Sequence, residues 1–93
     1  MKKRTFASVW DAIEDTPETA ASMRVRAELM IALQRYVDKR GETQSRAAKQ
    51  LGITQPRLND LLRGRIEKFS LDALVNMLAR VGQQVDVKVK KAA

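Results

Sequence analysis

The stretch from residue 44 to residue 64, QSRAAKQLGITQPRLNDLLRG, decides the fold. It predicts two short amphipathic helices joined at Gly52, which reaches left-handed backbone angles at little steric cost. Thr54 stands where its hydroxyl can cap the second helix, and Pro56 falls in the first turn, where an amide has no intrahelical partner. We therefore expect a first helix over residues 43–51 and a second helix directly after Thr54.

Apolar residues within this stretch recur on the side of each helix that faces the other helix. At 3.6 residues per turn, leucines spaced three and four residues apart fall on one face. A pair of alanines is small enough for the two helices to cross closely. The residues expected to point inward are Ala47, Ala48, Leu51, Ile53, Leu58, Leu61 and Leu62.

The opposite face of the second helix is polar and suited to reading DNA. Glutamine and asparagine side chains can pair with adenine, arginine can pair with guanine, and aspartate can accept from cytosine N4. Thr54 and Arg63 are better placed for phosphates, although Arg63 and Arg65 also suit a helix C-terminus, whose dipole favours cations. The predicted DNA-contacting residues are Gln44, Ser45, Thr54, Gln55, Arg57, Asn59, Asp60, Arg63 and Arg65.

The same stretch resembles the Cro and repressor class of helix-turn-helix proteins, called the Xre family. The resemblance rests on Gln44, the alanine pair, the run from Gly52 to Gln55, the spaced leucines and a closing glycine. In that family the glutamine that opens the first motif helix braces the one that opens the recognition helix, which implies that Gln44 supports Gln55. This chain departs from the pattern at Pro56 and Arg57, where more flexible polar residues are common. Helix pairs joined at a glycine also occur in domains that bind no DNA, but the combined spacing favours DNA.

Composition agrees with a nucleic-acid partner and excludes several chemistries. The 93 residues suffice for one domain over residues 1–93, and a net charge of +7 with a pI near 10.3 favours a polyanion, nucleic acid before an anionic membrane. Cysteine and histidine are absent, which excludes disulfides, thiol or imidazole catalysis and ordinary structural zinc. The sequence shows no membrane-length apolar run, no signal-like segment, no nucleophile and base pair and no phosphate-cradling glycine loop. We expect a cytoplasmic protein without enzymatic activity, cofactor or metal.

Residues 5–16 form an acidic, amphipathic leader segment. Asp11, Glu14 and Asp15 fall within it, and no lysine or arginine does. Its apolar residues recur at i, i+3, i+4 and i+7, which is the spacing of one helix face. That face must be buried, either on the chain's own domain or a sister subunit, or on a different, basic protein. The residues of the face, and so the candidate partner-binding residues, are Phe6, Val9, Trp10 and Ile13.

Two further helices complete the expected core. Thr16 and Pro17 predict the start of a long helix that Gly41 closes, and Ser70 predicts the cap of a last helix that Gly82 ends. Their apolar residues at helical spacing are Met23, Ala27, Leu29, Met30, Leu33, Tyr36, Val37, Leu71, Leu74, Val75, Leu78 and Val81.

Residues 84–91 alternate apolar and charged side chains, which predicts a short strand with one apolar face. The apolar positions are Val85, Val87 and Val89. A single strand needs a partner edge, so we expect it to pair with a second copy or another protein, the alternative being a loosely ordered basic tail. The expected fold is mainly α: a five-helix or near five-helix lambda-repressor-like bundle with a helix-turn-helix and a short C-terminal β-strand.

Taken together, the leader, the long helix, the motif, the last helix and the valine-alternating segment resemble small HigA-like antitoxins of bacterial toxin-antitoxin pairs. That resemblance implies a homodimer that represses its own promoter and masks a small basic RNase of the HigB or RelE type. A stand-alone Xre-type regulator with similar flanks is the alternative. In either case one motif offers few contacts, so we expect a two-fold dimer on an inverted-repeat operator in double-stranded DNA, with recognition helices about 34 Å apart.

Overall fold

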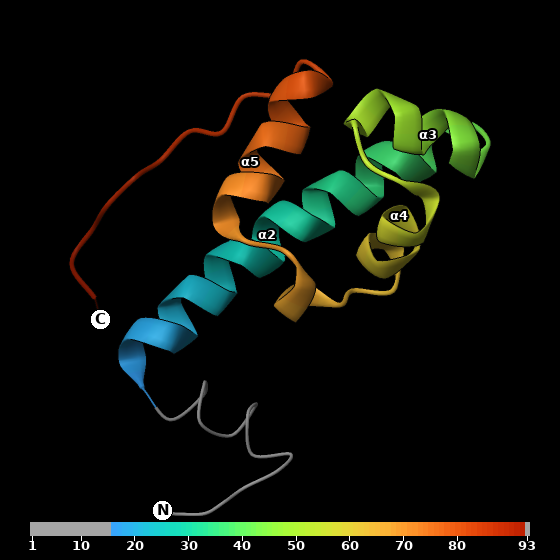
Figure 1. Ribbon diagram of the computed structural model, residues 1–93. Coiled ribbons are helices and arrows are strands. Elements are labelled where there is room, and N and C mark those ends of the chain that lie inside the picture. Colours follow the sequence, from blue (N-terminus) through green and yellow to red (C-terminus); the bar gives the residue numbers. More distant parts are fainter. Residues whose placement is uncertain (1–15, 93) are drawn as a thin grey trace, which may run out of the picture.

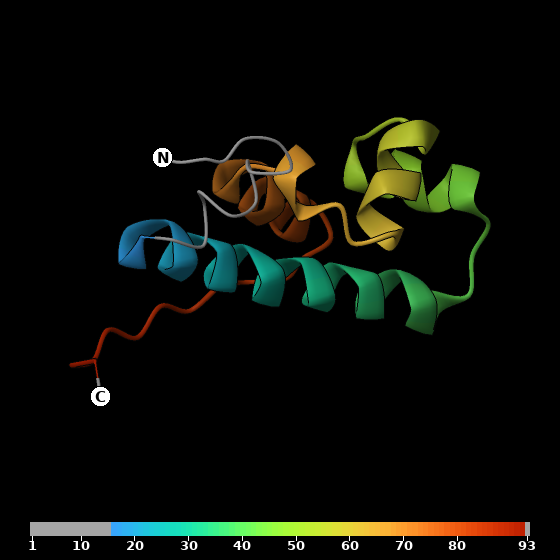
Figure 2. The same cartoon turned by 90° about the horizontal axis from the view of Figure 1, so that it is seen from below.

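The computed structural model describes residues 16–92, and helices account for most of them. A long helix, α2 (Pro17–Arg40), is followed by α3 (Gln44–Leu51), α4 (Gln55–Leu62), the short 3₁₀ turn η1 (Ile66–Lys68) and α5 (Leu71–Arg80). Figure 1 shows α5 crossing α2, with α3 and α4 grouped toward the C-terminal end of α2. In Figure 2, α2 runs along one side while α3, α4, η1 and α5 lie on the other. α5, η1 and α4 pack on α2, and α3 packs on α4 and α5.

The helix ends follow the sequence signals that predict them. Thr16 caps α2 by accepting a hydrogen bond from the amide three residues on, at 3.1 Å, and Pro17 occupies the first turn. Gly41 then ends α2 in the left-handed region, at φ 62°. Ser70 caps α5 in the same way, again at 3.1 Å. Because each hydroxyl satisfies an amide that has no partner within its helix, the predicted starts of α2 and α5 are confirmed.

One hydrophobic core joins all these elements. Each helix contributes buried side chains to it, and η1 adds Ile66, with Phe69 following directly after. The two alanines of α3 face the core, which permits the close helix crossing that the sequence predicts. The buried residues are Met30, Leu33, Ala47, Ala48, Leu51, Leu58, Leu61, Ile66, Phe69, Leu74, Met77 and Leu78, with Ile53 and Leu62 packed against them partly exposed.

The buried face of α5 differs slightly from the predicted one. Its buried residues are Leu74, Met77 and Leu78, and the sequence prediction omitted Met77. Leu71 is instead 41% exposed, because it is the first residue of the helix and lies at the edge of the contact with the core. Gly82 ends the helix as predicted: it follows the C-cap Val81 in the left-handed region, at φ 77°.

The predicted C-terminal strand is wrong. Residues 83–92 contain no regular secondary structure, and Figure 1 shows them as an extended trace running away from α5. Val85 packs partly against the core, whereas Val87 and Val89 are 81% and 89% exposed. The physical reason is that a strand requires hydrogen bonds to a neighbouring edge, and residues 16–92 offer no such edge. Alternating side chains alone do not make a strand.

The predicted count of five helices is also wrong for the described part of the chain, which contains four α-helices and one 3₁₀ turn. The mainly helical class and the helix-turn-helix fit the structure. The leader segment, with Phe6, Val9, Trp10 and Ile13, lies outside the described residues except for the α2 cap at Thr16. No helix among residues 16–92 combines the length and apolar character that crossing a bilayer requires.

Candidate nucleic-acid interface

The corner between α3 and α4 has the geometry that the sequence predicts. Gly52 adopts φ 75° at the end of α3, and the Ile53 amide donates to the Ala48 carbonyl at 3.0 Å, which closes the last turn. The Arg80 side chain of α5 lies so close to Gly52 that a Cβ there would stand 2.5 Å from its Nε. Thr54 then caps α4 through the amide three residues on, at 3.3 Å. Glycine suits both the backbone angle and the close approach.

α4 is fixed to the rest of the fold along one face and at its C-terminal end. Leu58 and Leu61 are both 0% exposed. From α2, the Gln34 side-chain amide donates to the Leu61 carbonyl at 2.8 Å, beside the Gly64 amide, which donates to the same carbonyl at 3.1 Å. The orientation of α4, and with it the direction of its polar face, is therefore set by the core and by α2.

The predicted DNA-contacting residues mostly lie on the surface of the motif. Gln44 and Gln55 are the first residues of α3 and α4. No hydrogen bond joins their side chains in the described structure, so the expected support of Gln55 by Gln44 stays a prediction. Arg57 and Asp60 are partly buried. The exposed residues of the set are Gln44, Ser45, Thr54, Gln55, Asn59, Arg63 and Arg65.

Arg57 is turned back toward its own domain. Its Nη1 donates to the Lys68 carbonyl at 3.2 Å, and the guanidinium carbon lies 4.5 Å from the centroid of the Phe69 ring. Such a cation over an aromatic face is attractive by about 0.5 to 2 kcal/mol. Base reading by Arg57 would require these contacts to be released, so its placement favours a role in holding α4 to the segment after η1.

Asp60 and Arg65 form an ion pair beside the end of α4. Their side chains approach to 3.8 Å, and the Arg65 amide donates to the Asp60 carbonyl at 3.0 Å. A partly exposed pair of this kind contributes little stability, at most about 1 kcal/mol. It does hold a carboxylate and a guanidinium side by side next to Arg63, which is exposed and has no ion-pair partner in the described structure.

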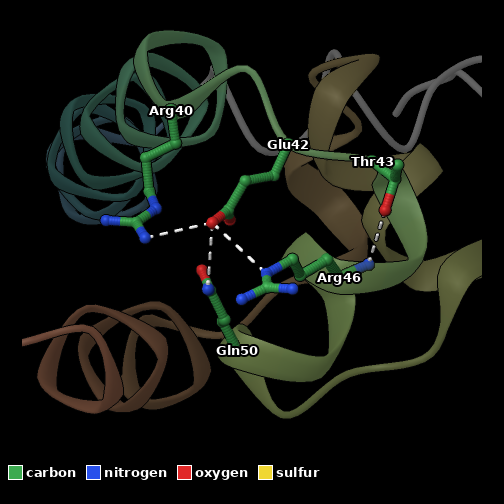
Figure 3. Close-up of polar contacts among 5 residues, drawn as sticks. All are labelled: Arg40, Glu42, Thr43, Arg46 and Gln50. Atoms are coloured by element: carbon green, nitrogen blue, oxygen red, sulfur yellow. Dashed lines mark hydrogen bonds and ion pairs between the residues drawn. The ribbon is translucent and has the colours of Figure 1, made fainter.

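A polar cluster that the sequence analysis missed joins α2 to α3. Figure 3 shows the Glu42 carboxylate receiving contacts from three side chains. Glu42 Oε2 lies 3.0 Å from the guanidinium of Arg40, 3.4 Å from the side-chain amide of Gln50 and 3.5 Å from Nε of Arg46. The signal available in the sequence is the i, i+4 spacing of Glu42 and Arg46, directly around the Thr43 cap.

The cluster fixes the entry to the motif. The Thr43 hydroxyl accepts a hydrogen bond from the Arg46 backbone amide at 3.2 Å, and Glu42 forms an ion pair with the Arg46 side chain. The backbone and the side chain of Arg46 are therefore both fixed to the connection after α2. The Arg40 guanidinium, by its hydrogen bond and its charge, holds the pKa of Glu42 below the ordinary glutamate value, and the same contact raises the pKa of Arg40. The Glu42 carboxylate therefore stays ionised to lower pH than an ordinary glutamate, and its contacts with the two arginines are kept.

We expect Glu42→Gln to flatten the acid dependence of stability. A glutamate whose pKa is lowered by folding contributes stability above its unfolded pKa, about 4.3, and that contribution is lost as the pH falls through the folded value. Urea unfolding from pH 7 down to pH 3 should therefore show a smaller loss for Glu42→Gln than for the parent chain. Glu67→Gln, which changes an exposed carboxylate of η1, is the control and should follow the parent curve. Identical acid slopes for the parent and Glu42→Gln would contradict the role of this carboxylate.

The chemistry available on this surface is that of binding. Residues 16–92 contain no group of acidic, histidine or cysteine side chains placed to hold a metal ion. Exposed amides on α4 can exchange hydrogen bonds with base edges. Arg46 and Lys49, exposed cations on α3 that the sequence analysis did not include, add positive charge beside the motif. A polyanion with readable edges is the partner that fits such a surface.

Comparison with known proteins gives a family and a structural neighbour. The family model described as "Helix-turn-helix domain" matches residues 12–90, which include every described helix from α2 to α5. A solved structure titled "Putative XRE Family Transcriptional Regulator" matches with a TM-score of 0.71 and 30% sequence identity, covering 78% of this chain and 82% of that chain. No curated protein matches.

Proposed function

Because this chain belongs to the helix-turn-helix domain family and is of the XRE type, we propose that it is a DNA-binding transcriptional regulator that reads its operator through α4. The observation that carries the proposal is the two-sided character of this helix. Leu58 and Leu61 are completely buried, while Gln55 and Asn59 on the same helix are exposed. A rigidly seated helix with free amides is what direct readout in a major groove requires.

The remaining candidate contacts divide by the part of DNA that they suit. Gln55 and Asn59 are proposed to read base edges, with Gln44 and Ser45 at the start of α3 supporting them. Contacts to phosphate are proposed for residues at the ends of α4 and beyond it, where side chains are exposed and are either positively charged or carry a hydroxyl that can donate. These residues are Thr54, Arg63 and Arg65.

A single motif offers too few base contacts for tight, specific binding, so we propose a homodimer on an inverted repeat. Two-fold symmetry would place two copies of α4 in successive major grooves, about 34 Å apart. Binding there would repress transcription by excluding polymerase from the promoter.

Selection of bound duplexes from a random DNA pool, at near-physiological salt, tests this function. The parent chain is expected to enrich an inverted repeat, and a Gln55→Ala, Asn59→Ala double variant is expected to lose that enrichment. A Gln83→Ala, Asn76→Ala double variant is the control, because it removes one glutamine and one asparagine from exposed positions outside the motif. Asn76 lies on α5 and Gln83 follows it, and this variant should behave as the parent. Failure of the parent chain to enrich any sequence would reject sequence-specific regulation.

A second candidate function, that of an antitoxin, is favoured by the charge of the leader segment. Residues 5–16 carry acids and no lysine or arginine, in a chain of net charge +7. In this proposal the leader binds a small basic RNase and so inhibits it, while the motif regulates the shared operon. A neighbouring reading frame for a basic protein of that kind would favour this function, and a complex that forms equally well without residues 1–16 would reject the role of the leader.

A further inference from the structure

An apolar groove runs along α2 from Ala20 to Gln34, on the side next to η1. Its walls are formed by Met23, Ala27 and Ile31 of α2 and by Ile66 of η1. Its volume is about 420 Å³, which is large enough to receive several side chains. Arg24 is the charged residue in its lining, and no acidic residue takes part.

The groove is open in the described structure. No segment among residues 16–92 covers it, and Ile31 remains 45% exposed in its wall. Removing apolar surface of this kind from water is favourable. A contiguous apolar groove beside a single cation therefore favours an occupant with an apolar face and negative charge.

We propose that the occupant is the leader segment of the same chain, bound through Phe6, Val9, Trp10 and Ile13. These residues have the spacing of one helical face. A helix over residues 6–13 would be about 12 Å long, and the groove wall from Met23 to Ile31 spans about 14 Å along α2, at 1.5 Å per residue. The two apolar surfaces match in length.

The connection is short enough to make this contact within one chain. Thr16 caps the first turn of α2, and Ala20, one turn later, already lines the near end of the groove. Glu14 and Asp15 are the residues between the end of the apolar face and that cap, which is a length typical of the loop in an antiparallel helix pair. The leader would therefore fold back along α2 without a long linker.

The charges of the leader agree with this placement. At 100° per residue, Asp11 falls opposite the apolar face, while Glu14 and Asp15 lie in the connection to α2. Docking thus removes the apolar face from water and leaves the acids at the surface. A basic partner could still meet those acids, so this inference holds whether or not the antitoxin function does.

The single tryptophan of the chain makes the contact measurable. Trp10 should emit at clearly shorter wavelength in the folded parent chain than in the chain unfolded in urea, because its indole is buried in the groove. Ile31→Glu, which places a negative charge in the groove wall, should shift the emission most of the way to the unfolded value. Val25→Glu is the matched control, because Val25 is also on α2, is likewise 45% exposed and does not line the groove. Its emission should equal that of the parent.

Circular dichroism of each variant separates loss of docking from loss of the fold: Val25→Glu should keep the helix content of the parent, and Ile31→Glu should lose no more than the short leader helix, which is unstable when undocked. Dilution tests whether the docked leader comes from the same chain or from a second copy. Trp10 emission that does not change with protein concentration supports docking within one chain. Emission that shifts to longer wavelength on dilution would overturn it in favour of an exchanged leader. Trp10 emission at the unfolded wavelength in the parent, or an unchanged emission in Ile31→Glu, would overturn the groove as the binding site.

Discussion

Leu58→Ala is expected to lower the free energy of unfolding by about 2 to 5 kcal/mol, the largest effect we expect from a single substitution in α4. Leu58 is 0% exposed and points from α4 into the shared core. Its truncation removes apolar contacts and leaves a cavity that the surrounding helices can fill only in part. Since small domains are stable by about 5 to 15 kcal/mol in total, one substitution removes a large share of that stability.

Urea unfolding followed by circular dichroism measures this loss. Leu71→Ala is the matched control, because it removes the same atoms from an exposed position on α5 and should change stability by less than about 0.5 kcal/mol. DNA binding by Leu58→Ala should weaken mainly as the folded fraction falls, with the sequence preference of the remaining folded protein retained. Equal stability losses for the two variants would show that α4 is not seated in the core as described.

Signals that act over a few residues could be predicted from the sequence. The hydroxyl caps at Thr16, Thr54 and Ser70 depend on an amide three residues away, and all three are present. The turn at Gly52 likewise depends on one backbone angle. Because these interactions are local, the residue pattern is enough to predict them.

Interactions between distant segments could not be predicted in this way. The Arg57 guanidinium meets the Phe69 ring only because η1 brings that ring back beside α4. Sequence spacing placed Arg57 near the N-terminal tip of the second helix as a DNA contact, and spacing carries no information about a neighbour twelve residues later in the chain. The contact of Gln34 with the end of α4 is of the same kind.

The C-terminal segment shows the opposite error, in which a local pattern was given too much weight. Val85, Val87 and Val89 alternate as they would in a strand, but alternation describes only where side chains point. A strand also requires a second edge to receive its hydrogen bonds. Within residues 16–92 that edge is missing, and the segment has no regular structure.

Gln55→Ala and Arg63→Ala are expected to weaken DNA binding in two different ways. Gln55, exposed at the first position of α4, is proposed to pair with a base edge, so its loss should reduce affinity for the preferred operator by about 1 to 3 kcal/mol and leave random DNA unaffected. Arg63, exposed at the C-terminal cap of α4, is proposed to contact a phosphate. Its loss should weaken binding to every sequence alike, because phosphates are the same in all of them.

Salt dependence distinguishes the two residues further. Each phosphate contact releases about one counterion, so the slope of log affinity against log salt concentration should become shallower by about one in Arg63→Ala and stay constant in Gln55→Ala. Affinities for the selected operator and for a random duplex, each measured over a series of salt concentrations, give both quantities. Lys90→Ala, which removes an exposed cation from the C-terminal segment after α5, controls for the change in net charge. If Gln55→Ala and Arg63→Ala lost affinity equally on operator and random DNA, α4 would not be the element that reads sequence.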